Sequence, residues 1–395
     1  MSRLWAGIDS GRTHHHCVVL DTDGIKLLSR RVANDEPELL QLLADVLALA
    51  DEATWAVDMA DGGAALLIAL LVNHGQELLY IPGRAVNRAS DGYRGEGKTD
   101  ARDALVIADQ ARIRRDLKPI RPSDEITTEL KLFTALRTDL ACDRNRSINR
   151  LRATLTSMFP ALERALDVTT KGPLVLLTGY QTPAAIRRSG LTRLTKWLRA
   201  RNVRNESLAT AALEAADRQH TAVPGEAAIA SMVLAPVEEV MALNEKIAEV
   251  DKLIEGRFRR HELAEVITSM PGIGSLLGAE FLAVIGSDMA SFATPDRLAA
   301  FAGMAPVPHD SGKSHGNLHR PQQYHRGLQR VFYTSALISI RSDPNSRRFY
   351  DRKRAEGKRH VQAVLALARR RVNVFWALIR DRRCYQVTPP VTHAA

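Results

Sequence analysis

Four aspartates and one serine, Ser311, are the residues of this 395-residue chain whose types and spacing suit them for chemistry. Asp100 and Asp103 are three positions apart at the start of an expected helix, so both carboxylates project from one helix face, one turn apart. Asp9 and Asp58 each follow a short apolar run, where a strand is expected to end. Carboxylates that converge repel one another unless cations neutralise them. The usual solution is two Mg²⁺ about 3.5–4 Å apart, which catalyse phosphoryl transfer.

A plainer interpretation of the Asp100 helix needs no metal. Thr99 is a suitable N-cap, and acids in the first turn of a helix are favoured by the helix dipole. Two capping acids on a surface helix would give the same spacing. The functional interpretation therefore depends on the elements that carry Asp9 and Asp58.

The elements expected before residue 118 would bring these acids together. The sequence predicts strands at 4–9, 14–20, 25–32, 54–59 and 77–81, helices at 37–50 and 64–73, and a polar loop at 82–98. Three antiparallel strands followed by alternating helices and strands resemble the ribonuclease H-like fold. In that fold the first strand, the fourth strand and a later helix carry the catalytic acids. We therefore expect an α/β domain over residues 1–118.

One rival explains part of the same pattern. Gly7–Gly11 followed by Asp21–Gly24 resembles the first phosphate motif of actin-like sugar kinases. Such kinases need a second glycine-rich phosphate turn and an adenosine-binding Gly-Gly element. Neither occurs in the expected context, and the later chain is helical and basic, which disfavours a kinase.

Long helices are expected after a linker at 119–122. Apolar residues recur with helical spacing over 125–159 and, close to a heptad pattern, over 237–258. These two helices could pair within one chain or between chains. We expect a helical, coiled-coil region over 124–265, then a helical domain over 266–395 whose Pro-Gly-Ile-Gly turn resembles a helix-hairpin-helix element.

The charge distribution indicates a polyanionic partner. The net charge is +10, and the segment from Lys313 to Arg383 holds 18 Lys or Arg against four acids. No apolar run approaches the roughly 20 residues that span a bilayer. The first residues lack the apolar region of a signal peptide, and the three cysteines have no paired spacing. These features predict a cytoplasmic protein without a membrane segment.

Ser311 lies in a polar loop over residues 305–316, too long for a simple turn. A serine hydroxyl is a poor nucleophile until a base or a metal takes its proton. His309 and His315 are nearby candidates for proton carriers. A Ser-Gly pair in such a loop is most often only a loop, so its chemistry requires further support.

Five motifs in order give that support, because together they resemble the insertion-sequence transposases of family one hundred and ten. They are Gly7-Ile8-Asp9, residues 98–104, Met270-Pro271-Gly272-Ile273-Gly274, Asp310-Ser311-Gly312-Lys313 and residues 349–358. The resemblance covers nearly the whole chain. It departs at one point: the second acid of the family is commonly Glu, whereas Asp58 stands here, with Asp61 as the alternative.

The resemblance implies a transposase, a site-specific DNA recombinase. A RuvC-like DEDD domain would hold two Mg²⁺ through Asp9, Asp58, Asp100 and Asp103. A transposase domain would supply Ser311 as the nucleophile that forms a covalent serine–phosphate intermediate. It also implies donor and target DNA, a guide RNA encoded by the element, and a homo-oligomer, either a dimer or a tetramer. The alternatives are a RuvC-like junction-resolving nuclease, which would not need Ser311, and a non-enzymatic nucleic-acid-binding scaffold.

Overall fold

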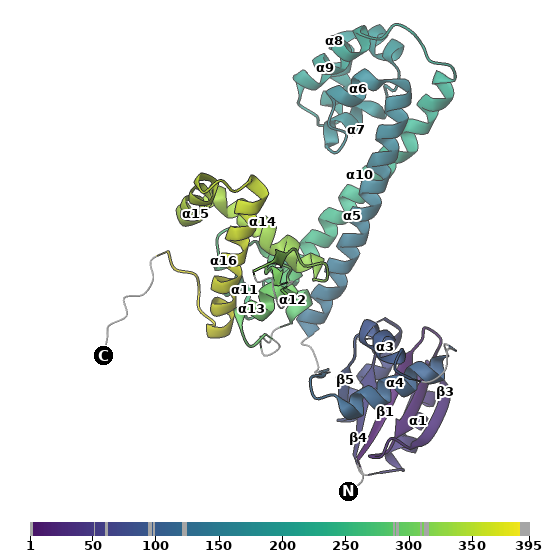
Figure 1. Cartoon of the computed structure of the whole chain (residues 1–395). Helices are drawn as coiled ribbons and strands as arrows, with labels where there is room; N and C mark the ends of the chain where they lie inside the picture. Colours follow the sequence, from purple (N-terminus) through teal and green to yellow (C-terminus); the bar gives the residue numbers. More distant parts are fainter. Residues whose placement is uncertain are drawn as a thin grey trace. The chain divides into compact units, whose positions relative to one another are not determined.

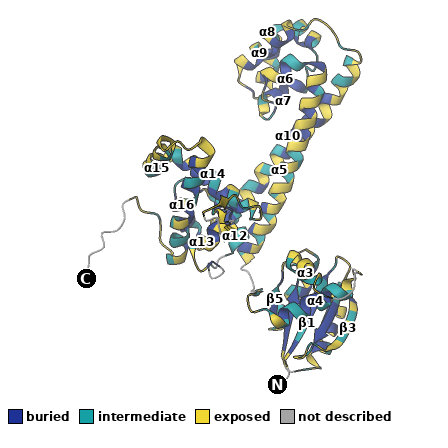
Figure 2. Cartoon of the chain, viewed as in Figure 1, coloured by how far each residue is buried: buried dark blue, intermediate teal, exposed yellow. Residues whose placement is uncertain are grey.

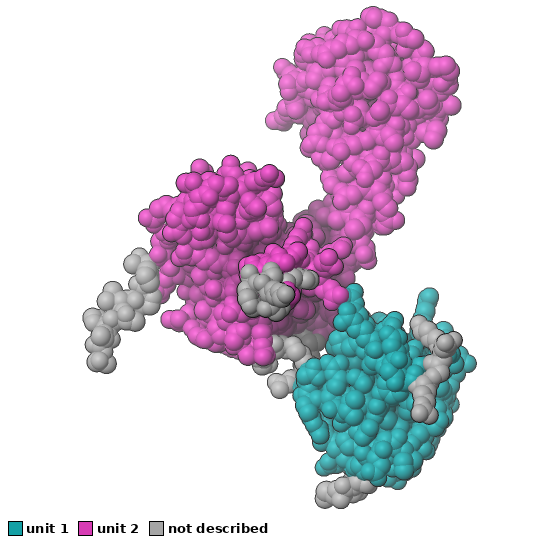
Figure 3. All heavy atoms as spheres, in the orientation of Figure 1, with its two compact units in different colours: residues 1–123 teal, residues 124–395 magenta. Residues whose placement is uncertain are grey.

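The computed structural model divides the chain into two compact units, residues 1–123 and residues 124–395 (Figure 3). The residues that the structure describes are 3–50, 52–59, 62–93, 97, 99–120, 125–286, 289, 292–308, 310–311 and 316–387. Within these ranges no helix is both long enough and apolar enough to cross a membrane. Each unit is described separately below.

The first unit is built on one mixed sheet with the strand order β3-β2-β1-β4-β5-β6. β1 pairs antiparallel with β2 and parallel with β4, β2 pairs antiparallel with β3, β4 pairs parallel with β5, and β5 pairs antiparallel with β6. The strands are β1 Arg3–Ser10, β2 His14–Leu20, β3 Lys26–Ala33, β4 Glu52–Val57, β5 Glu77–Tyr80 and β6 Lys118–Pro119.

Helices cover both faces of this sheet (Figure 1). Successive strand residues point to opposite faces. Leu4, Ala6 and Ile8 of β1 therefore enter the core beneath α1 (Glu36–Leu47) and α2 (Ala65–Asn73). The other face, with Ala56 of β4, packs against α3 (Gly83–Ser90) and α4 (Asp100–Ile113). The mixed α/β unit expected over 1–118 is present.

Two of its elements differ from the sequence-based expectation. α3 forms inside the expected loop at 82–98. The sequence did not predict this helix, because it buries only Val86 and so shows no apolar periodicity. β6 forms at the start of the expected linker. There Pro119 pairs with Leu79 at the sheet edge, where a residue without an N–H is tolerated.

The second unit is almost entirely helical. Its helices are α5 Glu125–Met158, α6 Pro160–Ala165, α7 Lys171–Leu177, α8 Pro183–Ala200, α9 Glu206–Asp217, α10 Glu226–Phe258, α11 Ala264–Ser269, α12 Ser275–Ile285, α13 Pro295–Phe301, α14 Arg326–Ser342, α15 Pro344–Ala355 and α16 His360–Asp381. A short β-hairpin, β7 Val307–Pro308 with β8 Leu318–His319, lies between α13 and α14.

The two long helices expected from the apolar pattern pair within the chain. α5 and α10 run antiparallel, joined by ion pairs between Glu129 and Arg257 at 3.0 Å and between Arg150 and Glu239 at 3.5 Å. One end of this hairpin carries a core formed with α6–α9, and the other end packs into a core formed with α11–α16 (Figures 1 and 2). The apolar faces of α5 and α10 therefore pack against each other in part, while Leu132 and Leu136 of α5 remain exposed. The homo-oligomer stays a prediction.

The expected Pro-Gly-Ile-Gly turn joins α11 to α12. Gly272 has a φ of +81°, and a Cβ there would lie 2.5 Å from the backbone oxygen of Ser335 on α14. Only glycine fits this conformation and this contact. The structure thus gives Gly272 a packing role against α14.

Candidate active site

The ends of two parallel strands place Asp9 and Asp58 side by side. In the β1–β4 register Ile8 pairs with Val57, so Asp9 and Asp58 are the next residues along each chain. Asp58 has the same strand parity as Ala56, whose side chain enters the core beneath α3 and α4. Both carboxylates are partly exposed and belong to the face of the sheet that α4 covers.

α4 lies directly on β1, which brings Asp103 to the same place. A Cβ at Gly7 would come within 2.2 Å of the Ala108 nitrogen and 2.4 Å of the Ala104 oxygen. The helix begins with Thr99 as N-cap, whose side chain accepts a hydrogen bond from the Arg102 nitrogen at 3.2 Å. The expected helix start is therefore confirmed, and the contact at Gly7 sets the depth at which the helix sits.

Three of the four predicted acids line one cavity of about 570 Å³ in the first unit, together with residues of α3 and of the α3–α4 connection. They are Asp9, Asp58 and Asp103. Burial raises the pKa of Asp58, and the nearby charge of Asp103 raises it further, while hydrogen bonding from Ser10, whose nitrogen lies 3.2 Å from Asp58 Oδ1, opposes the shift. The cavity is therefore lined by carboxylates whose negative charges repel one another.

Asp100 stands apart from these three. It is exposed at the first position of α4 and does not line the cavity. Its charge acts on His16 of β2: burial lowers the pKa of His16, and Asp100 opposes that shift. Among the described residues, no three His, Cys, Asp or Glu side chains lie close enough together to hold a metal ion. Asp61, the alternative second acid, lies outside those residues.

Arg102 is a residue of this site whose role the sequence pattern did not predict. Its guanidinium donates to the backbone oxygens of Gly97 at 2.9 Å, Tyr93 at 3.0 Å and Ser90 at 3.2 Å. These bonds tie the end of α3 and the following connection to the first turn of α4, and Arg102 itself lines the cavity. Its place between Asp100 and Asp103 in the motif was the one available signal.

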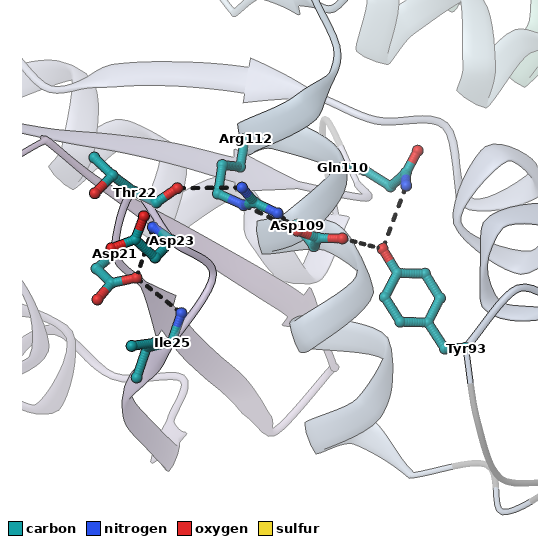
Figure 4. A network of polar contacts seen from close by, with 8 residues as sticks. All are labelled: Asp21, Thr22, Asp23, Ile25, Tyr93, Asp109, Gln110 and Arg112. Carbon is teal, nitrogen blue, oxygen red and sulfur yellow. Dashed lines mark hydrogen bonds and ion pairs between the residues drawn. The ribbon is translucent and has the colours of Figure 1, made fainter.

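A polar network fixes the second half of α4 (Figure 4). The Tyr93 hydroxyl donates to Asp109 at 2.5 Å, and Asp109 forms an ion pair with Arg112 at 2.7 Å. Arg112 also donates to the backbone oxygen of Thr22 at 3.2 Å. The helix that carries Asp103 is thereby fastened to the α3–α4 connection and to the β2–β3 turn.

The β2–β3 turn is stabilised by hydrogen bonds between its own residues. The Asp21 carboxylate accepts hydrogen bonds from the backbone nitrogens of Asp23 at 2.9 Å and Ile25 at 2.8 Å (Figure 4). An aspartate that bonds its own backbone in this way is a common turn former. The Asp21–Gly24 segment, which had favoured a kinase, thus has a structural explanation.

Ser311 belongs to the second unit. It is exposed, in the segment between β7 and β8. The preceding residue, Asp310, accepts a hydrogen bond from the Asn317 nitrogen at 3.0 Å, which closes the base of this loop. His309 and His315 lie outside the described residues. The predicted site residues are thus divided, with the acids in the first unit and the serine in the second.

The chain combines an acidic α/β unit with an arginine-rich helical unit. Comparison with known proteins shows that it belongs to the class of transposases, which act on DNA. Residues 6–160 match a family model for a DEDD-type transposase domain. Residues 264–351 match the model described as the transposase IS116/IS110/IS902 family. The chain belongs to this IS110 family of insertion-element transposases.

Three relatives are similar to this chain over nearly their whole length. The 42 kDa protein of insertion element IS900 from Mycobacterium paratuberculosis is 56% identical over 396 residues, which covers 99% of each chain. The 44.8 kDa protein of IS116 from Streptomyces clavuligerus is 50% identical, over 100% of this chain and 98% of the relative. The 43.6 kDa protein of IS110 from Streptomyces coelicolor is 37% identical, over 98% and 96%.

Proposed function

We propose that the chain cuts and exchanges DNA strands through a covalent intermediate on Ser311, with the acidic cavity as its metal site. The observation that carries this proposal is that Asp9, Asp58 and Asp103, from three separate elements, line a single cavity. The strand order with three antiparallel strands first supports a ribonuclease H-like, RuvC-like fold for this unit. Family membership supports DNA as the substrate.

The chemistry of the donor set suits a hard divalent cation, and binding would have to draw the three carboxylates closer together than they lie in this structure. Carboxylate oxygens are the ligands that Mg²⁺ prefers, and the raised pKa of Asp58 indicates that its charge needs compensation. We assign Asp9, Asp58 and Asp103 as ligands, and Asp100, one turn before Asp103, as the fourth acid. Two bound Mg²⁺ would activate an oxygen nucleophile and stabilise the leaving oxygen.

The proposed covalent step uses the residues of this chain as follows. Ser311 Oγ attacks phosphorus, and the new O–P bond forms as the bond from phosphorus to the leaving sugar oxygen breaks. The serine proton passes to a base, for which His309 or His315 is proposed, and the leaving oxygen takes up a proton. Because one phosphoester replaces another, the strand can be rejoined without ATP.

The proposed partners are donor and target DNA and a guide RNA encoded by the element. The excess of basic residues from Lys313 to Arg383 supports contacts with a phosphate backbone. Guided recognition requires such backbone contacts and leaves sequence reading to base pairing. A dimer or a tetramer would allow the serine of one protomer to serve the acids of another.

The test is a search for the covalent adduct. Stalled reactions on DNA that carries the element ends should contain DNA attached to Ser311, stable to denaturant and sensitive to protease. Ser311→Ala should lose both the adduct and recombination, because alanine has no oxygen to attack phosphorus. Ser314→Ala, in the same loop, is the matched control and should retain both. Recombination by Ser311→Ala would reject the proposal.

A junction-resolving nuclease is the second candidate, favoured by the finding that the cavity is built from the first unit alone. Water would then be the nucleophile. Ser311→Ala would still cut branched DNA, Asp103→Asn would not, and no adduct would form in any variant. A non-enzymatic scaffold would bind nucleic acid and cut in none of these experiments.

A further inference from the structure

A second cavity, of about 790 Å³, lies in the helical unit among α15, α16 and the chain that follows α16. Its lining joins three kinds of side chain: the guanidiniums of Arg348, Arg352 and Arg370, the aromatic rings of Phe349 and Tyr385, and aliphatic groups that include Leu367 and Val374. This volume is within the range of small-molecule binding sites.

Two of the arginines carry uncompensated charge. Within the described ranges, neither Arg348 nor Arg370 has a carboxylate partner: Arg348 donates to the Asn345 side chain, and Arg370 meets only the Phe349 ring. By contrast, Arg347, on the same helix and outside the cavity, is held by Asp351 at 2.8 Å. Unpaired guanidiniums beside a cavity favour an anionic ligand, and their planar shape matches phosphate oxygens in pairs.

Phe349 contributes an aromatic ring to the lining of the cavity. The guanidinium carbons of Arg352 and Arg370 lie 5.1 and 5.3 Å from the centre of its ring. Cations at such distances are attracted to the ring face. The ring is thus already covered by cations, so a flat aromatic group that enters the cavity would have to displace one of these guanidiniums to stack on Phe349, and the displaced positive charge would remain beside it.

One residue of the cavity lining, Arg371, is a buried arginine whose hydrogen bonds are made within the protein. Arg371 is only 4% exposed, and burial lowers its pKa to about 10. It donates to Ser335 Oγ at 2.6 Å and to the backbone oxygen of Pro271. Asp343, the acid of the lining, is occupied as the N-cap of α15, where it accepts from the Ser346 nitrogen at 2.9 Å. The single carboxylate among the described lining residues is thus bonded to its own helix.

We propose that this cavity binds one unpaired nucleotide of a nucleic-acid strand, with the base against Phe349 and the phosphate between Arg348 and Arg370. The inference rests on the proposed function, since it assumes that the chain handles nucleic acid. A paired base is stacked inside its duplex and offers no free face, so the site selects single-stranded segments or bases turned out of a duplex. DNA and RNA share this chemistry.

The test measures binding of the full chain to three labelled oligonucleotides of equal length: single-stranded DNA, single-stranded RNA and duplex DNA. Each single strand carries one 2-aminopurine, whose fluorescence falls when it stacks on an aromatic ring. Phe349→Leu keeps the apolar volume but removes the ring. It should abolish the quenching and weaken single-strand binding by roughly tenfold, with little effect on the duplex. Phe349→Tyr should retain the quenching.

Arg370→Gln should also weaken single-strand binding, whereas the matched control Arg347→Gln removes one charge from α15 outside the cavity and should leave the quenching intact. Equal losses of duplex and single-strand binding in Phe349→Leu, or unchanged quenching, would overturn the inference. If only one of the two single strands, the DNA or the RNA, is bound with quenching of its 2-aminopurine fluorescence, that kind of strand is the ligand. If the chain recombines DNA but the variants change neither quenching nor single-strand binding, only the nucleotide site in this cavity is refuted. If the chain binds no oligonucleotide, the proposed function is refuted.

Discussion

Gly7 on β1 and Ala108 on α4 are in backbone contact, because a Cβ on Gly7 would lie only 2.2 Å from the Ala108 nitrogen. Close packing of strand and helix at this point sets the height of α4 above the sheet. The position of Asp103 relative to Asp9 and Asp58 depends on that height. A residue without a side chain thereby determines how the acidic cavity is assembled.

Gly7→Ala should therefore move α4 outward. Overpacking of this kind typically costs about 1–3 kcal/mol, and we expect the upper end because backbone atoms cannot move aside easily. The check is urea unfolding together with a cleavage assay. Gly83→Ala is the matched control for stability, because a methyl group at that position would have no heavy atom within 4 Å. A stable, fully active Gly7→Ala protein would contradict the packing argument.

Replacement of Asp9, Asp100 or Asp103 by Asn should abolish recombination while leaving the fold intact, because amides bind Mg²⁺ far less well than carboxylates. A chelator should have the same effect on the unmodified protein. Circular dichroism and nucleic-acid binding would confirm that the variants are folded. Activity of Asp100→Asn in the presence of chelator would remove the metal hypothesis. If Asp58→Asn is silent and Asp61→Asn is not, Asp61 is the second acid.

His325 should make the stability of the helical unit depend on pH. Its Nδ1 caps α14 by accepting from the Leu328 nitrogen at 3.2 Å, which requires a neutral ring, and burial lowers its pKa below 6.5. A folded-state pKa below the unfolded value means that this stability is present above pH 6.5 and is lost as the pH falls through the folded-state pKa. We expect a loss of about 1 kcal/mol, the usual value of an N-cap.

Unfolding of the unmodified chain and of His325→Asn, measured from pH 7.5 downward, would test this prediction. Asparagine caps helices well and does not titrate in this range. The difference between the two unfolding free energies isolates His325 from His15 and His16, whose pKa values are also lowered by burial. A difference that does not change with pH would show that the cap is not sensitive to protonation.

Binding of duplex DNA should fall steeply with salt. Contact with about six to ten phosphates would weaken binding by about 10³–10⁵ between 50 and 200 mM salt. Arg354→Gln, within the basic segment, should reduce the slope, whereas Arg218→Gln, paired with Glu214 elsewhere in the unit, should not. A shallow dependence on salt would mean that the charges from Lys313 to Arg383 face solvent instead of phosphate.

The sequence alone predicted the elements that carry Asp9, Asp58 and Asp103, because each of these acids sits at the end of a strand or the start of a helix with a clear apolar period, but it did not predict that Asp100 would lie outside the cavity. It could not predict α3, whose only buried residue is Val86, nor the bonds from Arg102 to backbone oxygens, which follow from how the connection folds. The heptad pattern predicted two long helices. Whether they pair within the chain depends on contacts such as Glu129–Arg257, which no local pattern contains.

The lengths of the paired helices α5 and α10, 34 and 33 residues, also set the distance between the two cores at the ends of the hairpin. A helix rises 1.5 Å per residue, so deletion of residues 137–143 together with 245–251 would bring the two ends of the hairpin closer by about 10 Å. Slightly less than two full turns are removed from each helix, so the remaining partners nearly keep their facing sides. Deletion of four residues from each would shorten the hairpin and also rotate one end against the other. The separation between the α6–α9 core and the α11–α16 core is thus adjustable in discrete steps of one heptad.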